Sequence, residues 1–405
     1  MTSPSQKQAL YKAIILVGGP SRATRFRPLS LDVPKPLFPV AGAPLIHHHL
    51  QALSKVHGLR EVLIVGFFED TVFNKFIEEA STEFPHIHIK YLREYQAMGT
   101  AGGIYHFRDE ILHGNPQQFF VMHVDIACSF PLNEMVAFHM KHRGLCTMLS
   151  KKIGHEQAKK YGCLVADQNT NQVLHYVEKP DTFVSDLISC GVYLFDAAVF
   201  TEIKKAMDAK KDSDEENDHY FLFGNSAHPS ITTPGLPSNG NDGRLSLERD
   251  LLRPLSESRK LYAYVTEGFW KQIKTAGSAV AASAAYLELQ YHAESNRLAR
   301  TEDNGPEIIG AVYIHPTAQV DSTAKHASCI LHSVIGWNSK IGAWARVEGT
   351  AVSDHNEEMM KNGVKLQNIT ILGKEVSVLD ETIIRNCIVL PHKELKSSYH
   401  SEILM

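Results

Sequence analysis

Short apolar segments alternate with amphipathic stretches through the first half of the chain. The apolar segments that read as strands are 13–17, 61–67, 86–92, 118–125 and 146–152. Amphipathic stretches such as 44–56 and 70–83 lie between them and predict helices. Alternation of this kind is typical of an α/β domain with a mainly parallel sheet covered on both faces. Ligands bind such sheets at the carboxyl ends of the strands, so residues that follow strands are candidates for chemistry.

A different period begins after a linker near residues 300–306, where apolar residues recur every six positions. The runs are Ile314 and Val320; Ile335, Ile341 and Val347; and Leu372, Val378, Ile384 and Leu390. A hexad period predicts a left-handed parallel β-helix, in which three hexads form one triangular coil. A small β-sandwich is the alternative, but three separate hexad runs disfavour it. About three coils is near the minimum for a stable stack, so we expect this domain to need a partner surface.

These patterns predict two domains, at 10–295 and 308–405, and 405 residues suffice for two cores. Within the first, the composition of 205–244 is rich in Lys, Asp, Glu, Gly, Pro and Ser, which predicts a disordered insertion. Within the second, the polar stretch 351–368 interrupts the hexads and reads as an inserted loop.

Composition and charge narrow the class of protein. The net charge of −4 gives no reason to expect nucleic acid or an anionic membrane as a partner. No apolar run reaches the length of a membrane span, and the first ten residues lack the apolar core of a signal peptide. Six scattered cysteines show no spacing for zinc or redox work. We therefore expect a cytoplasmic protein with free thiols.

The segment 12–36, KAIILVGGPSRATRFRPLSLDVPKP, carries the strongest chemical signal. A buried strand leads into a glycine-containing loop, and Arg25, Arg27 and Lys35 follow among prolines. Exposed backbone N–H groups and fixed cations after a strand suit a polyphosphate. The loop is not a Walker loop, because no Gly-Lys-Ser/Thr ends it.

This segment resembles the signature of the sugar-1-phosphate nucleotidyltransferases, Gly-Gly-x-Gly-Thr-Arg followed by Pro-Lys-Pro. The resemblance implies a Rossmann-like nucleotidyltransferase domain, with Arg25 and Lys35 as the catalytic contacts to the phosphates. The nucleotide-binding residues that it implies are Gly18, Gly19, Thr24, Arg25, Glu94, Gly99 and Thr100. The loop has two residues more than the usual signature, and Ala23 stands where the family has glycine. If that position needs a positive φ, alanine costs about 1–2 kcal/mol.

The segment EYQAMGTAGG, 94–103, matches the part of the family that reads the base. A carboxylate at Glu94 could accept hydrogen bonds from both N1–H and N2–H of guanine, whereas uracil offers one donor on that edge. Close approach of the base would explain a glycine at Gly99. A glycine-rich turn before a helix is the structural alternative. Together with the phosphate loop, the segment favours GTP over UTP.

The sugar half of the site matches YGCLV, VEKP and SCGVYLF. By this resemblance Gly162 would let the sugar approach the backbone, Glu178 would accept hydrogen bonds from its hydroxyls, and Lys179 would hold its phosphate. Ser189 belongs to the same half and replaces a common asparagine.

The metal position departs from the family. Asp125 ends a strand at the place of the family's Mg²⁺-binding aspartate, and one carboxylate plus phosphate oxygens suits Mg²⁺. Active members carry a second aspartate in Trp-x-Asp-Ile-Gly, but this chain reads WKQIK, with Gln272 there and Lys274 in place of the glycine. We expect weakened Mg²⁺ binding and little turnover. Lys274 could stand in for the metal or could simply point to solvent.

Within the family, the chain most resembles the alpha-type subunits of GDP-mannose pyrophosphorylase. The Trp-x-x-Ile-Lys replacement, VYIHPTA, GWNSKIGAWARVEGT and the insertion before ITILG carry this resemblance. It implies an oligomer with a catalytic beta-type subunit, and ligands among GDP-mannose, GTP and mannose 1-phosphate. A regulatory subunit that binds GDP-mannose is the first hypothesis. The second is an active enzyme that makes GDP-mannose and pyrophosphate, and a non-enzymatic scaffold is the third.

Overall fold

The structure is a computed structural model that describes residues 10–19, 26, 27, 29–31, 33–210, 244–300, 308, 310–314, 329–350, 360, 361, 364, 365 and 369–405. Contacts divide the chain into two compact units, and each is described by itself. The first unit comprises Met1–Gly18, Leu50–His123 and Phe130–Gly268. The second comprises Gly19–His49, Val124–Ser129 and Phe269–Met405.

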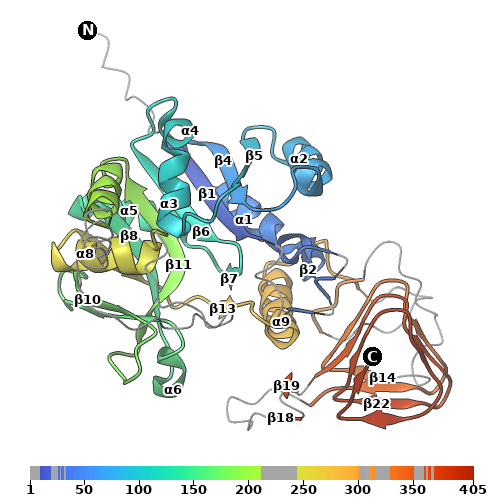
Figure 1. Ribbon diagram of the computed structural model, residues 1–405. Coiled ribbons are helices and arrows are strands. Elements are labelled where there is room, and N and C mark those ends of the chain that lie inside the picture. The colour runs from blue at the N-terminus through green and yellow to red at the C-terminus, as the bar shows by residue number, and fades with distance from the viewer. Residues whose placement is uncertain are drawn as a thin grey trace, which may run out of the picture. The chain divides into compact units, whose positions relative to one another are not determined.

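The first unit is built on a nine-stranded sheet with the order β10-β9-β11-β6-β1-β4-β5, extended by β8 on β11 and β12 on β8 (Figure 1). Its strands are β1 (Tyr11–Gly18), β4 (Leu59–Gly66), β5 (His88–Arg93), β6 (Gln118–His123), β8 (Cys146–Lys152), β9 (Gly162–Ala166), β10 (Val173–Glu178), β11 (Leu187–Asp196) and β12 (Leu261–Val265). The half formed by β6, β1, β4 and β5 is parallel. This half confirms the α/β pattern read from the sequence. The antiparallel β11 then joins it to β8 and β9.

Helices cover the sheet of the first unit. They are α2 (Thr71–Glu83), α3 (Thr100–His106), α4 (Arg108–Leu112), α5 (Leu132–His142), α6 (His155–Ala158), a helix over 199–210, the π-helix η4 (Leu247–Leu252) and α8 (Arg253–Glu257). The helix over 199–210 extends into the stretch predicted as a disordered insertion, and 211–243 lie outside the described residues. The core joins side chains of the central strands, such as Ile14, Leu63 and Val121, to Leu247 and Leu251 of η4. The residues after the insertion therefore complete this core.

The second unit contains three parallel sheets that form the sides of triangular coils, seen edge-on in Figure 1. The sheets have the orders β14-β17-β22-β25, β15-β20-β23-β26 and β16-β21-β24. Their strands are β14 (Cys329–Leu331), β15 (Ser333–Ile335), β16 (Lys340–Ile341), β17 (Arg346–Glu348), β20 (Thr370–Leu372), β21 (Ser377–Val378), β22 (Ile383–Arg385), β23 (Ile388–Val389), β24 (Glu394–Leu395), β25 (Tyr399–His400) and β26 (Ile403–Leu404). The predicted parallel β-helix is confirmed.

The hexad residues of successive coils stack in register. Ile335 pairs with Leu372, Ile341 with Val378, and Val347 with Ile384. One position of the last hexad run was wrong. After Ile384 the buried core residues are Cys387 and Val389, and Val389 rather than Leu390 pairs with Leu372 of the preceding coil. The corner at Asn386 therefore makes this step one residue shorter than the hexad period.

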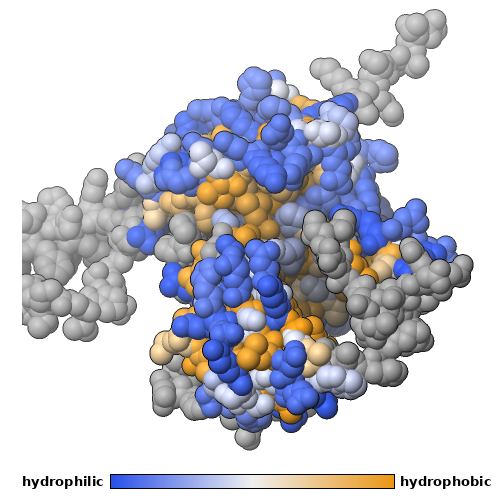
Figure 2. Space-filling view, turned by 90° about the vertical axis from the view of Figure 1, so that its right-hand side faces the viewer, coloured by the Kyte–Doolittle hydropathy of each residue, from blue (hydrophilic) through white to orange (hydrophobic). Residues whose placement is uncertain are grey.

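The insertion leaves the β-helix between β17 and β20. Its described residues form one antiparallel pair, β18 (Met360–Lys361) with β19 (Val364–Lys365). The hexad residue Val320 lies outside the described residues. Seen from the side in Figure 2, the visible surface is mostly hydrophilic, with hydrophobic areas between the hydrophilic ones.

Helix α9 (Ala276–His292) packs within the second unit. Thr275 and Ser278 form a capping box at its start, which satisfies backbone N–H groups that a helix leaves open. Its buried face consists of Ala276, Ala279, Ala282 and Tyr286, and the alanines allow close approach. This face shares a core with Ile371 of the β-helix and with Val40 of β2 (Pro39–Val40), which pairs with β3 (Ala43–Pro44).

One of three consecutive histidines on α1 (Leu45–Leu53), His48, takes part in this packing. The His48 ring stacks on Tyr286 with centroids 4.0 Å apart, and its Nε2 lies 2.8 Å from the carbonyl oxygen of Val40. Burial lowers the pKa of His48 to about 4, despite its hydrogen bond to Val40. This histidine is therefore neutral at pH 7 and fixes α1 to α9.

Candidate functional site

The base-reading segment belongs to the first unit and follows β5. The backbone N–H of Glu94 donates to the carbonyl oxygen of Gly66 at 2.7 Å. Its carboxylate lies against α3, because a Cβ atom on Gly103 would be 2.3 Å from Glu94 Oε1. Glycine at position 103 leaves room for the carboxylate in this position, and a larger residue would move it. Helix α3 and Glu94, which is predicted to recognise guanine, are thus in close contact.

Gly99 and Thr100 hold the segment that begins at Leu245. Gly99 has a φ of +80°, and a Cβ atom there would be 2.3 Å from the Leu245 carbonyl oxygen. The close approach expected of a base is therefore made by the chain's own backbone. The hydroxyl of Thr100 accepts a hydrogen bond from the Leu247 N–H at 2.8 Å. Both predicted nucleotide residues position the start of η4.

The predicted sugar residues Gly162, Glu178 and Lys179 are brought together in the first unit. Glu178 accepts a hydrogen bond from the Tyr176 hydroxyl at 2.8 Å and pairs with the Lys179 ammonium at 2.8 Å. A Cβ atom on Gly162 would be 2.2 Å from the Tyr176 hydroxyl. This glycine therefore makes space for the Tyr176–Glu178 hydrogen bond, and Glu178 is oriented before any ligand arrives.

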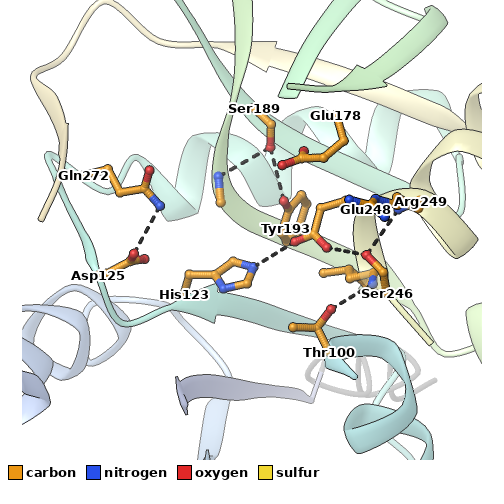
Figure 3. Close-up of polar contacts among 12 residues, drawn as sticks. Thr100, His123, Asp125, Glu178, Ser189, Tyr193, Ser246, Glu248, Arg249 and Gln272 are labelled. Atoms are coloured by element: carbon orange, nitrogen blue, oxygen red, sulfur yellow. Dashed lines mark hydrogen bonds and ion pairs between the residues drawn. The ribbon is translucent and has the colours of Figure 1, made fainter. Parts of the chain in front are cut away.

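Ser189 lies on β11 beside Tyr193. Their hydroxyl oxygens are 3.1 Å apart, and Ser189 is buried (Figure 3). Complete burial raises the pKa of Tyr193 well above its usual value, so this hydroxyl stays protonated. The serine that replaces the common asparagine is thus already paired with Tyr193.

Glu248, which sequence reasoning missed, lies in the same unit. Its Oε1 is 3.6 Å from His123 Nε2 at the end of β6, and its Oε2 accepts a hydrogen bond from the Ser246 hydroxyl at 2.8 Å (Figure 3). Burial raises the pKa of Glu248, but His123 and Ser246 together lower it to about 2. The carboxylate is therefore ionised. An acidic residue inside the apolar run LSLERDLL was the signal that could have found it.

The predicted phosphate and metal positions Lys35, Asp125 and Gln272 meet in the second unit. The antiparallel pair of β7 (Ile126–Cys128) and β13 (Trp270–Gln272) sets their spacing. Gln272 Nε2 donates to Asp125 Oδ2 at 3.1 Å, and Figure 3 shows the amide turned toward the carboxylate. Lys35 Nζ, at the 3₁₀ turn η3 (Lys35–Leu37), is 3.8 Å from the same oxygen.

This cluster fits Mg²⁺ poorly. Mg²⁺ prefers oxygen ligands, whereas Asp125 faces an N–H donor and an ammonium. The described residues hold no group of three His, Cys, Asp or Glu side chains that could bind a metal. Lys274 lies just before α9, and its backbone N–H donates to the Ser278 hydroxyl at 2.9 Å.

Other predicted residues are only partly placed. Gly18 has a φ of +68° at the end of β1, where glycine avoids the cost of a left-handed backbone. Gly19 follows it, and Thr24 and Arg25 lie outside the described residues. All six cysteines are free, and in the described part of the chain no helix is long and apolar enough to cross a membrane.

Comparison with known proteins places this geometry in a family. Residues 12–234 match the model of the nucleotidyl transferase family, and residues 321–404 match the model of the GMPPB C-terminal domain. The chain belongs to the nucleotidyl transferase family. Among solved structures it is similar to a UDP-glucose pyrophosphorylase complexed with UDP-glucose (TM-score 0.51, 20% identity, 68% of this chain and 98% of that chain), which shows the fold alone.

Curated relatives narrow the resemblance. The chain is 44% identical to a probable mannose-1-phosphate guanyltransferase of Schizosaccharomyces pombe, over 97% of this chain and 99% of that protein. It is 40% identical to the mannose-1-phosphate guanylyltransferase regulatory subunit alpha of Homo sapiens, over 98% of this chain and all of that protein. The regulatory subunit alpha of Dictyostelium discoideum is 42% identical, over 97% and 98%.

Proposed function

We propose that this protein is a cytoplasmic regulatory subunit that binds GDP-mannose or GTP-type ligands and controls GDP-mannose synthesis, with little catalysis of its own. The observation that carries the proposal is the hydrogen bond from Gln272 Nε2 to Asp125 Oδ2 at 3.1 Å. An aspartate at position 272 would supply a second negative charge to a metal. A unit charge pair at ~4 Å and an effective dielectric of about 20 is worth roughly 4 kcal/mol.

The remaining cations support binding without a metal. Lys35 already lies 3.8 Å from Asp125, and the chain places Lys274 where active members of the family have glycine. We infer that Lys274 supplies positive charge to the diphosphate in place of Mg²⁺. Calorimetric titration with GDP-mannose, with and without EDTA, tests this inference. Binding should be unchanged by EDTA, and a strict requirement for Mg²⁺ would rule the inference out.

The first-unit residues support recognition of a sugar nucleotide. The carboxylates of Glu178 and Glu248 are held in place by Tyr176 and by His123, and both can accept hydrogen bonds from hydroxyl groups. Glu94 is held against α3 and offers acceptors for a guanine edge. Regulation requires that the ligand stay bound rather than react, which retained recognition residues and an impaired metal position would together achieve.

An active mannose-1-phosphate guanylyltransferase is the second candidate, favoured by the guanyltransferase name of the Schizosaccharomyces pombe relative. The assay that separates the two measures GDP-mannose formed from GTP and mannose 1-phosphate by the purified chain. We expect little turnover, and an increase in the variant that combines Gln272→Asp with Lys274→Gly. Rapid turnover by the unmodified chain would establish the second candidate.

Regulation itself needs a partner. We propose that the chain forms an oligomer with a catalytic beta-type subunit, in line with the names of its regulatory relatives. Adding the chain to a catalytic homologue should strengthen inhibition by GDP-mannose. An inhibition curve that stays the same after addition, although sedimentation shows a complex, would contradict the regulatory role.

A further inference from the structure

A cavity lies in the first unit at the end of the strands opposite to His123. It has a volume of about 430 Å³ and is lined by residues at the amino ends of β8 and β12 and at the end of β11. The strand directions place it there, because β11 runs antiparallel to β6 and pairs Asp196 with Gln118, the first residue of β6. The cavity is therefore separate from the cluster around Glu248.

The charged residues of the cavity are Arg143, Arg259, Lys260 and Glu202. Glu202 is neutralised from two sides, because Lys260 Nζ is 2.9 Å and Lys205 Nζ is 3.3 Å from its Oε1. Three cations against one paired carboxylate leave the lining positive. Arg143 and Arg259 are exposed, and within the described part of the chain neither guanidinium group has an ion-pair or hydrogen-bond partner. Their ten N–H donors, five on each arginine, are therefore open to water or to a ligand.

Both arginines lie in left-handed turns that follow helices. Arg143 follows α5 with a φ of +53°, and Arg259 follows α8 with a φ of +59°. Glycine is the common residue at such left-handed positions after helices, because any side chain costs about 1–2 kcal/mol there. Two turns that meet at one cavity both carry arginine instead. Both turns thereby bring an arginine side chain to the lining of the cavity.

The rest of the lining suits a small anion. The helix over 199–210 begins at the cavity, with Ala198, Thr201 and Glu202 in the lining, and helix N-termini favour negative charge. The N–H of Ala198 already donates to Asp196 Oδ1 at 2.8 Å. This helix end therefore offers a ligand the positive end of its dipole rather than the N–H of Ala198. Tyr262 forms a wall and is fixed by stacking on His142 with centroids 3.8 Å apart.

We propose that this cavity binds a phosphate-bearing small molecule through Arg143, Arg259 and Lys260, at a site separate from the nucleotide-sugar residues. Arginine forms paired, charge-assisted hydrogen bonds with phosphate oxygens, and a phosphate carries enough negative charge for two guanidinium groups. The volume admits a phosphate with a small substituent. The phosphate group is the shared chemistry, whether it comes as a free ion or on a sugar.

The test follows backbone amide signals of the full chain by NMR during titration with inorganic phosphate, pyrophosphate and mannose 1-phosphate, each against sodium chloride at equal ionic strength. Signals of Gly144, Leu145 and Lys260 should shift and saturate with at least one phosphate compound. If the cavity recognises the phosphate group alone, all three compounds should shift the same amide signals. If it also contacts the sugar, mannose 1-phosphate should bind most tightly. Shifts that match sodium chloride would overturn the proposal.

Glycine substitutions keep the test clear of folding defects. The double variant Arg143→Gly with Arg259→Gly removes both guanidinium groups and relieves the left-handed backbone, so it should fold and unfold at or above the wild-type temperature. Its affinity should fall about tenfold or more for each arginine, as the loss of charge-assisted hydrogen bonds predicts. Arg253→Ala is the matched control, since Arg253 is exposed on α8 and pairs with Glu257 outside the cavity.

A third variant, Glu202→Gln, should bind the phosphate compound more tightly than the wild type. Glu202→Gln removes the one carboxylate of the lining and frees Lys260 for the ligand, so binding should tighten severalfold. Equal affinity of the double-glycine variant and the wild type, or weaker binding by Glu202→Gln, would contradict the proposal. None of these residues belongs to the recognition cluster, so the result is independent of GDP-mannose binding.

Discussion

Gln272 and Lys35 both direct N–H groups or positive charge at Asp125, within 3.1 and 3.8 Å. A metal would have to displace both interactions and would gain only one carboxylate. With an aspartate at position 272, the same fold would offer a divalent cation a second negative charge next to Asp125.

The first prediction at the residue scale concerns the aspartate that active members of the family carry at position 272. Gln272→Asp places two carboxylates side by side, so the variant should be less stable than the wild type without metal and should gain stability when Mg²⁺ is added. At a Mg²⁺ concentration 100 times the Kd the gain is about 2.7 kcal/mol. Thermal unfolding with EDTA or Mg²⁺ measures it. Gln272→Ala is the control, and a similar Mg²⁺ response in both variants would refute the prediction.

Two buried histidines and one half-buried histidine make stability depend on pH. The pKa values of His48, His139 and His142 are lowered to about 4, chiefly by burial. Between pH 6.5 and 4 the unfolded chain therefore binds more protons than the folded one. The stability conferred by the neutral rings is full above pH 6.5 and is lost as the pH falls toward 4.

The variant His48→Phe keeps a ring on Tyr286 but does not titrate. Each histidine contributes up to about 1.4 kcal/mol per pH unit within this window, so the variant should show a shallower fall in the free energy of unfolding. Urea unfolding at pH 7, 6 and 5 measures the slope. His292→Phe, which changes an exposed side chain, is the control. An unchanged slope for His48→Phe would show that this ring is not buried as described.

At the scale of elements, each β-helix coil depends on its hexad residues. Ile384 is fully buried between Val347 and the next coil, whereas its neighbour Ile383 is 44% exposed. Alternation of inward and outward side chains along a strand explains the difference. A coil with few residues per side has little other means of burying apolar area, so the loss of one core side chain affects the whole stack.

The matched pair Ile384→Ala and Ile383→Ala tests this view. The first should destabilise the second unit by about 2–5 kcal/mol, since it leaves a cavity in the core. The second should change stability by about 0.5 kcal/mol or less, as surface substitutions do. Hydrogen exchange of β17 and β22 amides reports the unit directly. Comparable losses in both variants would mean that the coil is not packed in this register.

At the scale of the whole molecule, binding should appear as a gain in stability. If the chain binds GDP-mannose without metal, the ligand in EDTA should raise the free energy of unfolding by about 2.7 kcal/mol at 100 times the Kd. Differential scanning calorimetry with the ligand and with UDP-glucose as the comparison measures it. An equal gain from both sugar nucleotides would argue against guanine recognition by Glu94.

The sequence by itself determined the element types and the family. The strands β1, β4, β5, β6 and β8 and the hexad coils follow local patterns, because burial on a strand or coil repeats at a fixed period. The departure at Gln272 and Lys274 follows from comparing the sequence motif with that of the family. The one wrong hexad position, Leu390, fell where a turn lost a residue, which a period cannot foresee.

Only the tertiary structure decided which side chains meet. Glu248 reaches His123 from a segment 125 residues away along the chain, and Gly99 proved to be required by the Leu245 backbone. Arg143 and Arg259 converge on one cavity from two separate turns. Hydrogen bonds and ion pairs of this kind depend on distances of a few ångströms between remote segments, and no local pattern of residues encodes such distances.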